Sequence, residues 1–290
     1  MGNLVRAMTA DGSARILALD STDIVKRASE IHGNGMAVNL IMGRVLTAAS
    51  LMGSLLGDEK DLLTVSFKGM GPAGTVLASS DYMGNVRGYM VNPEANIYIG
   101  NDGKPDICGA IGEGVLQVLR DTGEGEPYSG LSVLKKSDIS SDIASYYAES
   151  EQIPTVCAFG VAPDKNGKGF IAGGIIIQLM PFADEELIDI IEENLKNVKS
   201  IAEILENGSS EDLIKEYMRG VEYDIFDSMN AEYKCYCSVD KTDRALISLG
   251  KEELTALIND ELPTEITCRF CDVKYNYSKE RLSELLEQAK

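Results

Sequence analysis

Four of the six cysteines in this 290-residue chain form two close pairs near its C-terminus. One pair is Cys235-Tyr-Cys237 and the other is Cys268-Arg-Phe-Cys271, with 30 residues between them. Each short spacing directs two sulfur atoms at one point, and two such pairs make a tetrahedral four-thiolate site suited to Zn²⁺. The flanking residues are polar or charged, which argues against four unrelated buried thiols. We therefore expect the segment 232–290 to fold around one zinc ion held by these cysteines in their reduced state.

The start of the chain predicts the compartment in which these thiols lie. No apolar stretch of signal-peptide length follows Met1, and no uninterrupted apolar run reaches the roughly 18–20 residues that cross a bilayer. We therefore expect a cytoplasmic protein without a membrane partner. Because thiols are kept reduced there, paired cysteines indicate metal or redox chemistry rather than a disulfide scaffold.

The net charge of −19 argues against phosphate-bearing partners, because an acidic surface repels them; no nucleic-acid partner is expected. The charge is uneven: residues 179–231 hold 14 acidic and 4 basic residues, against 20 and 14 in residues 1–178. Of the 28 glycines, 25 precede residue 179. Composition thus predicts three parts: an N-terminal core domain (1–178), an amphipathic helical linker (179–231) and a C-terminal zinc-binding domain (232–290).

The N-terminal part has the pattern of an α+β fold. Strands are predicted at 12–20, 62–67, 75–78, 85–91, 115–119, 132–134, 155–161 and 169–179, and helices at 22–56 and 140–150. Many short strands separated by glycine turns predict a largely antiparallel sheet with helices packed against it. In the C-terminal part, helices are predicted around 251–260 and from Ser278.

The linker is predicted to hold a long amphipathic helix from Asp184 to Leu205, ended by Asn207-Gly208, and a second short helix after Ser209. The apolar stripe of the first helix is Leu187, Ile191, Leu195, Val198, Ile201 and Leu205. These helices either pack on the core as ordinary surface helices or form a detachable segment whose stripe is hidden or exposed. Periodicity alone does not separate the two interpretations.

The spacing of the first cysteine pair suggests a redox switch. Two residues of extended chain span about 6.6 Å, whereas a disulfide prefers Cα atoms about 5.5–6 Å apart, so Cys235 and Cys237 form a disulfide only if the backbone bends. Our hypothesis is that oxidation of this pair and the zinc-bound fold exclude each other. Loss of zinc is then expected to unfold residues 232–290.

With Tyr275-Asn-Tyr-Ser278 after the cysteines, the chain resembles the redox-regulated heat-shock chaperone family known as the 33 kDa chaperonin. The resemblance extends to Gly43-Arg-Val-Leu-Thr-Ala-Ala-Ser-Leu-Met-Gly53, Gly84-Asn-Val-Arg-Gly-Tyr89, Asn92-Pro93, Tyr128-Ser-Gly130, Ser150-Glu-Gln-Ile-Pro-Thr155 and Gly173-Gly-Ile-Ile-Ile-Gln-Leu-Met-Pro181. It implies an ATP-independent holdase, not an enzyme, that is inactive when reduced and zinc-bound.

The resemblance also implies roles for the four cysteines, each as a zinc ligand and a redox-active residue. Oxidation is expected to form the disulfides Cys235–Cys237 and Cys268–Cys271, to release zinc, and to give an active homodimer that holds unfolding client proteins.

Two other classes of function stay open on the residues alone. Cys268 and Cys271 resemble the dithiol of a thiol-disulfide oxidoreductase, and a four-cysteine zinc module also serves to bind a nucleic acid or a protein. No catalytic set is predicted. Cys108 and Cys157 are expected to be buried inert thiols, and His32 to lie on a helix surface or in a turn. Gly69-Met-Gly-Pro-Ala-Gly74 is expected to be a tight turn rather than a nucleotide site.

Overall fold

The computed structural model of the chain describes residues 1–101, 103–167, 169–181, 183–260 and 262–289. The chain divides into two compact units, residues 1–234, here called the core unit, and residues 235–290, the cysteine unit. Each unit is described by itself. The three-part division by composition concerns the roles of the segments and stays a prediction.

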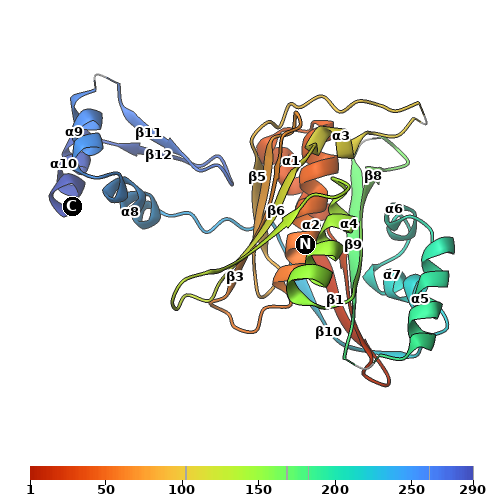
Figure 1. Ribbon diagram of the computed structural model, residues 1–290. Helices are drawn as coiled ribbons and strands as arrows, with labels where there is room; N and C mark the ends of the chain where they lie inside the picture. Colours follow the sequence, from red (N-terminus) through yellow and green to blue (C-terminus); the bar gives the residue numbers. More distant parts are fainter. Residues whose placement is uncertain (102, 168, 182, 261, 290) are drawn as a thin grey trace. The chain divides into compact units, whose positions relative to one another are not determined.

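The core unit contains two five-stranded antiparallel sheets (Figure 1). The first sheet has the order β10-β1-β2-β9-β8, made of Gly2–Thr9 (β1), Ala14–Asp20 (β2), Thr155–Pro163 (β8), Phe170–Leu179 (β9) and Tyr223–Ala231 (β10). The second has the order β5-β4-β3-β6-β7, made of Leu62–Gly69 (β3), Thr75–Asp81 (β4), Val86–Met90 (β5), Gly114–Asp121 (β6) and Tyr128–Val133 (β7). The predicted α+β class with antiparallel strands is confirmed, although the strands form two sheets.

Helix α2 (Gly43–Gly53) packs against both sheets and contacts β4 on one side and β9 on the other (Figure 1). Every residue of this helix except Arg44 is buried. Because a helix buried on all sides needs small or apolar residues at nearly every position, this accounts for the composition of α2. The predicted helix over 22–56 is wrong as a single element. It divides into α1 (Thr22–His32), a π-helical turn η1 (Val38–Met42) and α2, because Gly33 adopts a φ of +97° that glycine tolerates and that ends α1.

Three further helical segments of the described residues lie between β5 and β8 in the chain. They are α3 (Ile107–Ile111), α4 (Ile139–Tyr146) and the π-helical turn η2 (Tyr147–Glu151). The predicted helix over 140–150 therefore corresponds to α4 and η2, while α3 was not predicted. Asp138 caps α4 by accepting a hydrogen bond from the Ser141 backbone N–H.

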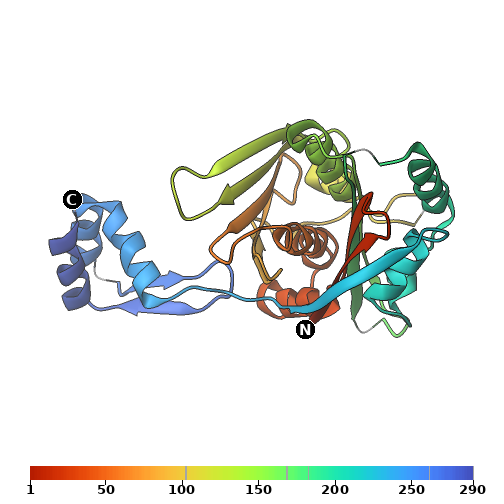
Figure 2. The ribbon, with the colours of Figure 1, turned by 90° about the horizontal axis from the view of Figure 1, so that it is seen from below.

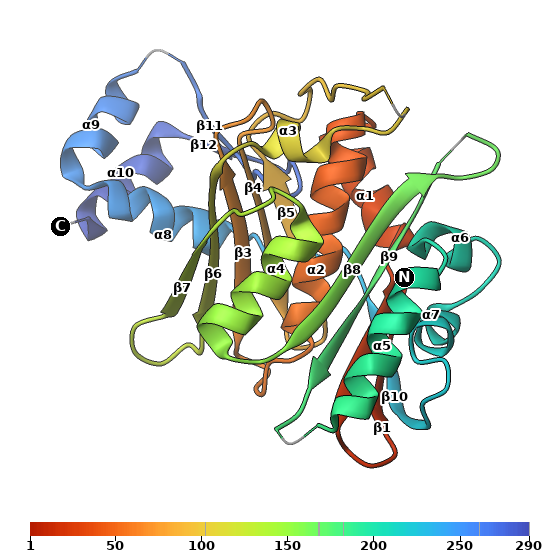
Figure 3. The ribbon, with the colours of Figure 1, turned by 45° about the vertical axis from the view of Figure 1, so that its right-hand side comes forward.

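Helices α5 (Glu185–Asn197), α6 (Ile201–Leu205) and α7 (Ser210–Tyr217) cover the face of the first sheet that points away from α2 (Figures 1 and 3). Their apolar residues pack on the sheet residues Val5, Ala7, Ile16, Ile175 and Ile177. With helices on both faces, β9 is buried along most of its length, as its apolar sequence requires. In this structure the linker helices are thus packed on the core.

The predicted single helix from Asp184 to Leu205 is wrong. Val198 leaves the helical conformation with φ −70° and ψ 142°, and a capping box between Ser200 and Glu203 starts α6 as a new helix. Leu187, Ile191, Ile201 and Leu205 are buried on the sheet, whereas Leu195 is 36% exposed. The break allows α6 to pack on a different part of the sheet from α5. The predicted apolar stripe is therefore buried as two separate segments, one on each helix.

The close packing of α6 on the sheet predicts the effect of one glycine substitution. A Cβ atom at Gly173 of β9 would lie 2.2 Å from Leu205 Cδ1 and 2.6 Å from the Leu19 backbone oxygen. Because that backbone belongs to the adjacent strand, we expect Gly173→Ala to lower the free energy of unfolding of the core unit by about 1–3 kcal/mol. Urea unfolding measures this value. Gly57→Ala, where a Cβ meets nothing within 4 Å, is the matched control and should change it by less than about 0.5 kcal/mol. Equal stability of the two variants would contradict this packing.

In the residues that the structure describes, the cysteine unit contains three helices and one hairpin (Figure 2). They are α8 (Val239–Leu249), α9 (Lys251–Asn259), β11 (Thr264–Thr267), β12 (Lys274–Tyr277) and α10 (Lys279–Gln288). The predicted helices near 251–260 and after Ser278 are present, while α8 was not predicted. The fully buried apolar residues are Leu246, Leu254, Tyr277, Leu282, Leu285 and Ala289. A core this small calls for an additional staple.

Candidate metal centre

The two cysteine pairs lie in two irregular segments of the cysteine unit. Cys235 and Cys237 lie directly before α8, whose N-cap is Ser238. Cys268 and Cys271 occupy the turn between β11 and β12, where the Cys268 carbonyl accepts hydrogen bonds from the N–H groups of Cys271 and Asp272. Asp272 has a φ of 57°, a left-handed conformation that aspartate tolerates in turns. Because this turn reverses the chain between Cys268 and Cys271, the sulfur atoms of both residues lie on the side of Cys235 and Cys237.

The four sulfur atoms of Cys235, Cys237, Cys268 and Cys271 lie within 4.8 Å of one another. Cys235 Sγ is 3.7 Å from Cys268 Sγ, and Cys237 Sγ is 3.4 Å from Cys271 Sγ. Four sulfurs around a tetrahedral Zn²⁺ with bonds of about 2.3 Å lie about 3.8 Å apart, whereas a disulfide bond is about 2.05 Å long. The arrangement therefore fits a four-thiolate zinc site, and all four cysteines are free thiols in this structure.

The pKa values of the thiols show that a cation has to compete with protons for the sulfur atoms at this site. In the protein alone, burial raises the pKa of Cys235 to about 11 and also raises the pKa of Cys271. Burial acts in the same direction on Cys237, but hydrogen bonds from Tyr275 and the neighbouring thiols outweigh it and lower the pKa of that group. A zinc ion that binds here must displace protons from the sulfurs, so its affinity is expected to fall as the pH falls.

Tyr275 on β12 lies next to the cysteine cluster. It belongs to the motif Tyr275-Asn-Tyr-Ser278, for which the sequence alone predicts no role at the site. Its hydroxyl donates a hydrogen bond to Cys237 Sγ at 3.1 Å. A donor to a ligating sulfur fixes the orientation of the ligand and spreads its negative charge. The signal in the sequence was its position, four residues after Cys271 at the start of a short strand.

We expect Tyr275→Phe to weaken zinc binding by about 10–100-fold, because it removes this hydrogen bond and keeps the ring. Competition with a chromogenic chelator measures the affinity. The control is Tyr128→Phe, because Tyr128 is 55% exposed on β7 of the core unit. A Tyr275→Phe protein that binds zinc as tightly as the control would show that the hydroxyl does not support the site.

A second polar cluster ties α8 to α10. The Tyr277 hydroxyl donates to Asp243 Oδ1 at 2.8 Å, and the Arg281 guanidinium donates to Asp243 Oδ2 at 2.6 Å. Burial raises the pKa of Asp243, but these two hydrogen bonds outweigh it and hold the pKa below its usual range. Because the folded pKa is depressed, this stabilisation is present at neutral pH and is lost as the pH falls through that pKa.

The two remaining cysteines lie in the core unit and outside the cluster. Cys157 on β8 is partly buried, and burial raises the pKa of its thiol, as expected for an inert residue. Cys108 in α3 is exposed, so the expectation that it is buried is wrong. Among the described residues, the group of metal-ligating side chains around Cys235 includes neither thiol.

The other sequence motifs have structural roles. His32 is the last residue of α1, as expected, and its Nε2 atom lies 3.0 Å from the Tyr233 hydroxyl. The segment from Gly69 to Gly74 joins β3 to β4 without a helix, which confirms a turn rather than a dinucleotide site.

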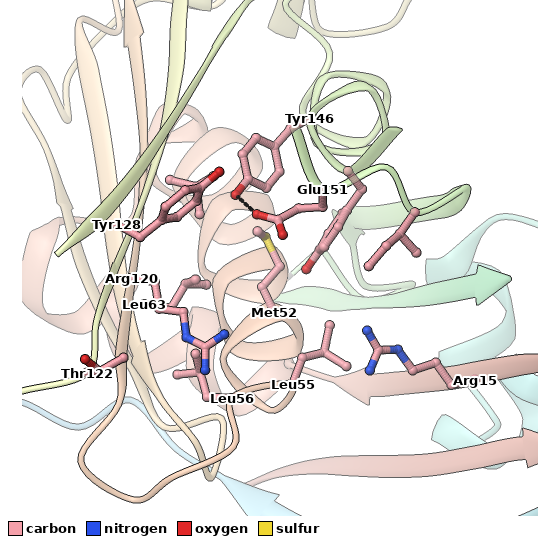
Figure 4. A pocket seen from close by; sticks show the side chains of 13 residues that line it. Arg15, Met52, Leu55, Leu56, Leu63, Arg120, Thr122, Tyr128, Tyr146 and Glu151 are labelled. Carbon is pink, nitrogen blue, oxygen red and sulfur yellow. Dashed lines mark hydrogen bonds between the residues drawn. The ribbon is translucent and has the colours of Figure 1, made fainter. Parts of the chain in front are cut away.

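A cavity of about 620 Å³ opens between α2, β6 and η2 in the core unit (Figure 4). Three of its polar side chains have protein partners: the Tyr146 hydroxyl donates to Glu151 at 2.6 Å, Arg120 donates to Asp61 at 2.8 Å, and Arg15 donates to Gln178 at 2.7 Å. The residues that line it are Arg15, Met52, Leu55, Leu56, Leu63, Val118, Arg120, Thr122, Tyr128, Tyr146, Tyr147, Glu151 and Ile153. None of these lining residues is a serine, cysteine or histidine, so the cavity brings no such nucleophile together with a base.

Among the described residues, no helix has both the length and the apolar character that crossing a bilayer demands.

Comparisons with known proteins assign the family. Residues 2–278 match the Hsp33 protein family. The chain is 38% identical over 287 residues to the 33 kDa chaperonin of Clostridioides difficile, covering 98% of each chain, and 38% identical over 289 residues to that of Enterococcus faecalis, covering 99% of this chain and 96% of the relative. It is also similar to the crystal structure of a 33 kDa chaperonin (heat shock protein 33 homolog) from Thermotoga maritima, with a TM-score of 0.89, 32% identity, and coverage of 99% and 98% of the two chains. The chain therefore belongs to the Hsp33 protein family.

Proposed function

We propose that this protein is an ATP-independent holdase whose activity is governed by oxidation of its four clustered cysteines. Its family is one of heat-shock chaperones rather than an enzyme class. The observation that carries the redox proposal is the cluster itself: four thiols at distances suited to zinc, in a unit whose own apolar core has six fully buried residues. The resemblance noted in the sequence supports the same interpretation.

In the reduced state, Cys235, Cys237, Cys268 and Cys271 hold one zinc ion, and Tyr275 orients the sulfur of Cys237. When bound, zinc keeps the sulfurs ionised, and thiolates are the form that oxidants attack. The four cysteines would thereby join the segments before α8 and between β11 and β12 through one ion, and this cross-link would compensate for the small core.

Activation is a two-electron oxidation of each neighbouring pair. Cys235 with Cys237, and Cys268 with Cys271, each form one S–S bond and transfer two electrons to an oxidant such as hypochlorous acid or peroxide. A sulfur in a disulfide no longer acts as a thiolate ligand, so this oxidation would release a bound zinc ion and remove the cross-link between the two cysteine pairs. The short sulfur–sulfur distances of 3.7 Å and 3.4 Å join cysteines of different pairs, so peptide mapping has to establish the connectivity.

The three segments then take different roles. The segment 232–290 is the redox switch, the segment 179–231 is the linker that responds to it, and the segment 1–178 is the core. The helices α5–α7 cover an apolar sheet face in this structure, and their release would expose that face and their own apolar stripe to unfolding clients. The 14 acidic residues of the linker keep such a protein soluble while apolar surface is exposed. Oxidised molecules associate as homodimers, in a cytoplasm that otherwise keeps the thiols reduced.

Zinc content and free thiols, counted in the denatured protein before and after oxidant, test this proposal. We expect one zinc per reduced chain and six free thiols, and after oxidation no zinc and two free thiols, those of Cys108 and Cys157. Retention of zinc after four thiols are lost would contradict the mechanism, as would loss of zinc with all six thiols intact.

The family assignment does not favour the thiol-disulfide oxidoreductase alternative. Insulin reduction at catalytic rates by the reduced protein would revive it.

A further inference from the structure

Residues 232–234, directly before the first cysteine of the cluster, lie along the outer edge of β5. The Val86 N–H donates to the Glu232 carbonyl at 2.9 Å, and the Lys234 N–H donates to the Val86 carbonyl at 2.9 Å. These bonds form a parallel bridge between Val86 and Tyr233. Because β5 is the end strand of its sheet, this short segment closes an edge that would otherwise offer free backbone groups.

A side chain closes the next position on the same edge. The Tyr233 hydroxyl donates to the Gly88 carbonyl at 2.8 Å and accepts from the Gly88 N–H at 3.3 Å. One hydroxyl thus stands in for both backbone partners of a neighbouring strand. Since its single proton points to Gly88, His32 Nε2, 3.0 Å away, is the donor in the contact with this oxygen.

The edge therefore presents a defined recognition pattern. Val86 and Gly88 direct their donors and acceptors outward at a spacing of two residues, which is the repeat of an extended chain. The ring of Tyr233 packs, partly buried, against the main apolar cluster of the core unit. Any replacement for residues 232–234 must be extended, must offer backbone groups, and gains most if it carries an aromatic side chain at the position of Tyr233.

The connection to Cys235 makes this closure dependent on the metal site. While Cys235 is a ligand, the residue that follows Lys234 is ordered as part of the cysteine unit. When the cysteine unit unfolds, the C-terminal side of the segment becomes free, and ordering residues 232–234 on β5 then costs more conformational entropy. The segment becomes easier to displace from the edge.

We infer that the outer edge of β5, at Val86 and Gly88, is a docking site for an extended segment of unfolded polypeptide that bears an aromatic side chain. The client segment takes the place of residues 232–234 after the cysteine unit unfolds, and adds to the second sheet as a further strand. This inference rests on the proposed holdase function and names one of its binding surfaces.

Amide hydrogen exchange at three N–H groups tests the inference, because they report on different partners. In the reduced, zinc-bound protein, the amides of Val86, Gly88 and Lys234 are expected to be protected. Oxidation without a client should speed exchange at all three. Addition of reduced, carboxymethylated lactalbumin, which stays unfolded, should restore protection at Val86 and Gly88 while Lys234 continues to exchange. This split pattern identifies a client strand in place of the chain's own segment.

The same oxidised sample is assayed for suppression of aggregation, which separates the two proposals. Suppression without renewed protection at Val86 and Gly88 overturns the docking site and leaves the holdase function standing. Renewed protection that depends on protein concentration and not on client assigns the edge to a second copy of this chain, which also overturns the inference. Absence of suppression overturns the holdase function and this inference with it.

Tyr233→Phe keeps the ring and removes the hydroxyl that closes Gly88. In the reduced variant we expect faster exchange at Gly88 with Val86 still protected, and easier displacement of the segment by client after oxidation. Tyr128→Phe, an exposed tyrosine on β7, is the matched control and should leave both amides unchanged. A Tyr233→Phe protein with unchanged Gly88 exchange would show that the hydroxyl does not close the edge.

Discussion

Removal of zinc from the reduced protein by a chelator is expected to unfold residues 235–290 and to leave the two sheets and helix α2 of the core unit folded. A structural zinc site contributes on the order of 10–16 kcal/mol to a small domain. A fully buried leucine contributes only about 1.5–3 kcal/mol. The buried core of the cysteine unit has four leucines, one tyrosine and one alanine to offset the entropy of ordering the whole unit. The two sheets and the buried helix α2 of the core unit contain none of the four clustered cysteines, so their folding does not depend on the metal.

Amide hydrogen exchange measures this outcome directly. We expect α8, α9 and α10 to lose all protection on chelation while β2, β3 and β9 keep theirs. Cys271→Ser should show the same loss without a chelator, and Cys108→Ser, which removes an exposed thiol outside the cluster, should behave as the unchanged protein. Retained protection in α8–α10 of a zinc-free, reduced sample would refute the dependence of this unit on its metal.

The second large effect is expected in chaperone activity. The oxidised protein should suppress aggregation of a thermally unfolding client, and the reduced, zinc-bound protein should be at least about tenfold weaker. A zinc contribution of the size given above keeps the unfolded form of the cysteine unit well below one per cent of the reduced population. Light scattering of the client, measured at a series of chaperone concentrations, gives the ratio.

A ligand variant separates oxidation from zinc loss as the cause of activation. Cys271→Ser, if unfolded in the cysteine unit as expected, should suppress aggregation in reducing buffer without any oxidant. Cys108→Ser should still need oxidant. Equal suppression of aggregation by the reduced and the oxidised forms of the unchanged protein would contradict the redox switch. An inactive Cys271→Ser protein would mean that the disulfides, rather than the loss of the metal cross-link, create the active form.

The parts of the fold that were predictable have strong local signals. The apolar runs of β2, β3, β8 and β9 and the capped helix α7 appear close to where the pattern places them. Strand β10 does not show such a signal: it is acidic and largely exposed, and only its pairing with β1 makes it a strand. Pairing between segments more than 200 residues apart in the chain has no local trace.

The sequence contains a local signal for the break between α5 and α6, but the continuous apolar spacing across this point predicts a single helix. Ser200 and Glu203 form a capping box, which marks a helix start, but Leu195, Val198 and Ile201 continued the apolar spacing across it. No glycine or proline separates α5 from α6. Tertiary packing on the sheet, which requires α6 to lie in a new direction, decided the conformation of Val198.

At the metal centre, spacing within each pair was enough to predict the four cysteines as a group. The distances between the pairs were not predictable, because they depend on how α8, α9 and the β11–β12 hairpin pack around a small core. For the same reason the hydrogen bond from Tyr275 to Cys237 has no signal beyond its place after the second pair.

The pairing of β1 with β10 has a consequence for the synthesis of the protein. Gly2 pairs with Ala231 and Thr9 with Tyr223, so β1 has only one of its two neighbours until residues 223–231 have been made. β2 covers its other edge early. A nascent chain therefore carries an open strand edge, which is a template for unwanted pairing, through most of its translation. The first cysteine pair, Cys235 and Cys237, follows β10 within six residues, so the edge closes only shortly before these two expected metal ligands emerge.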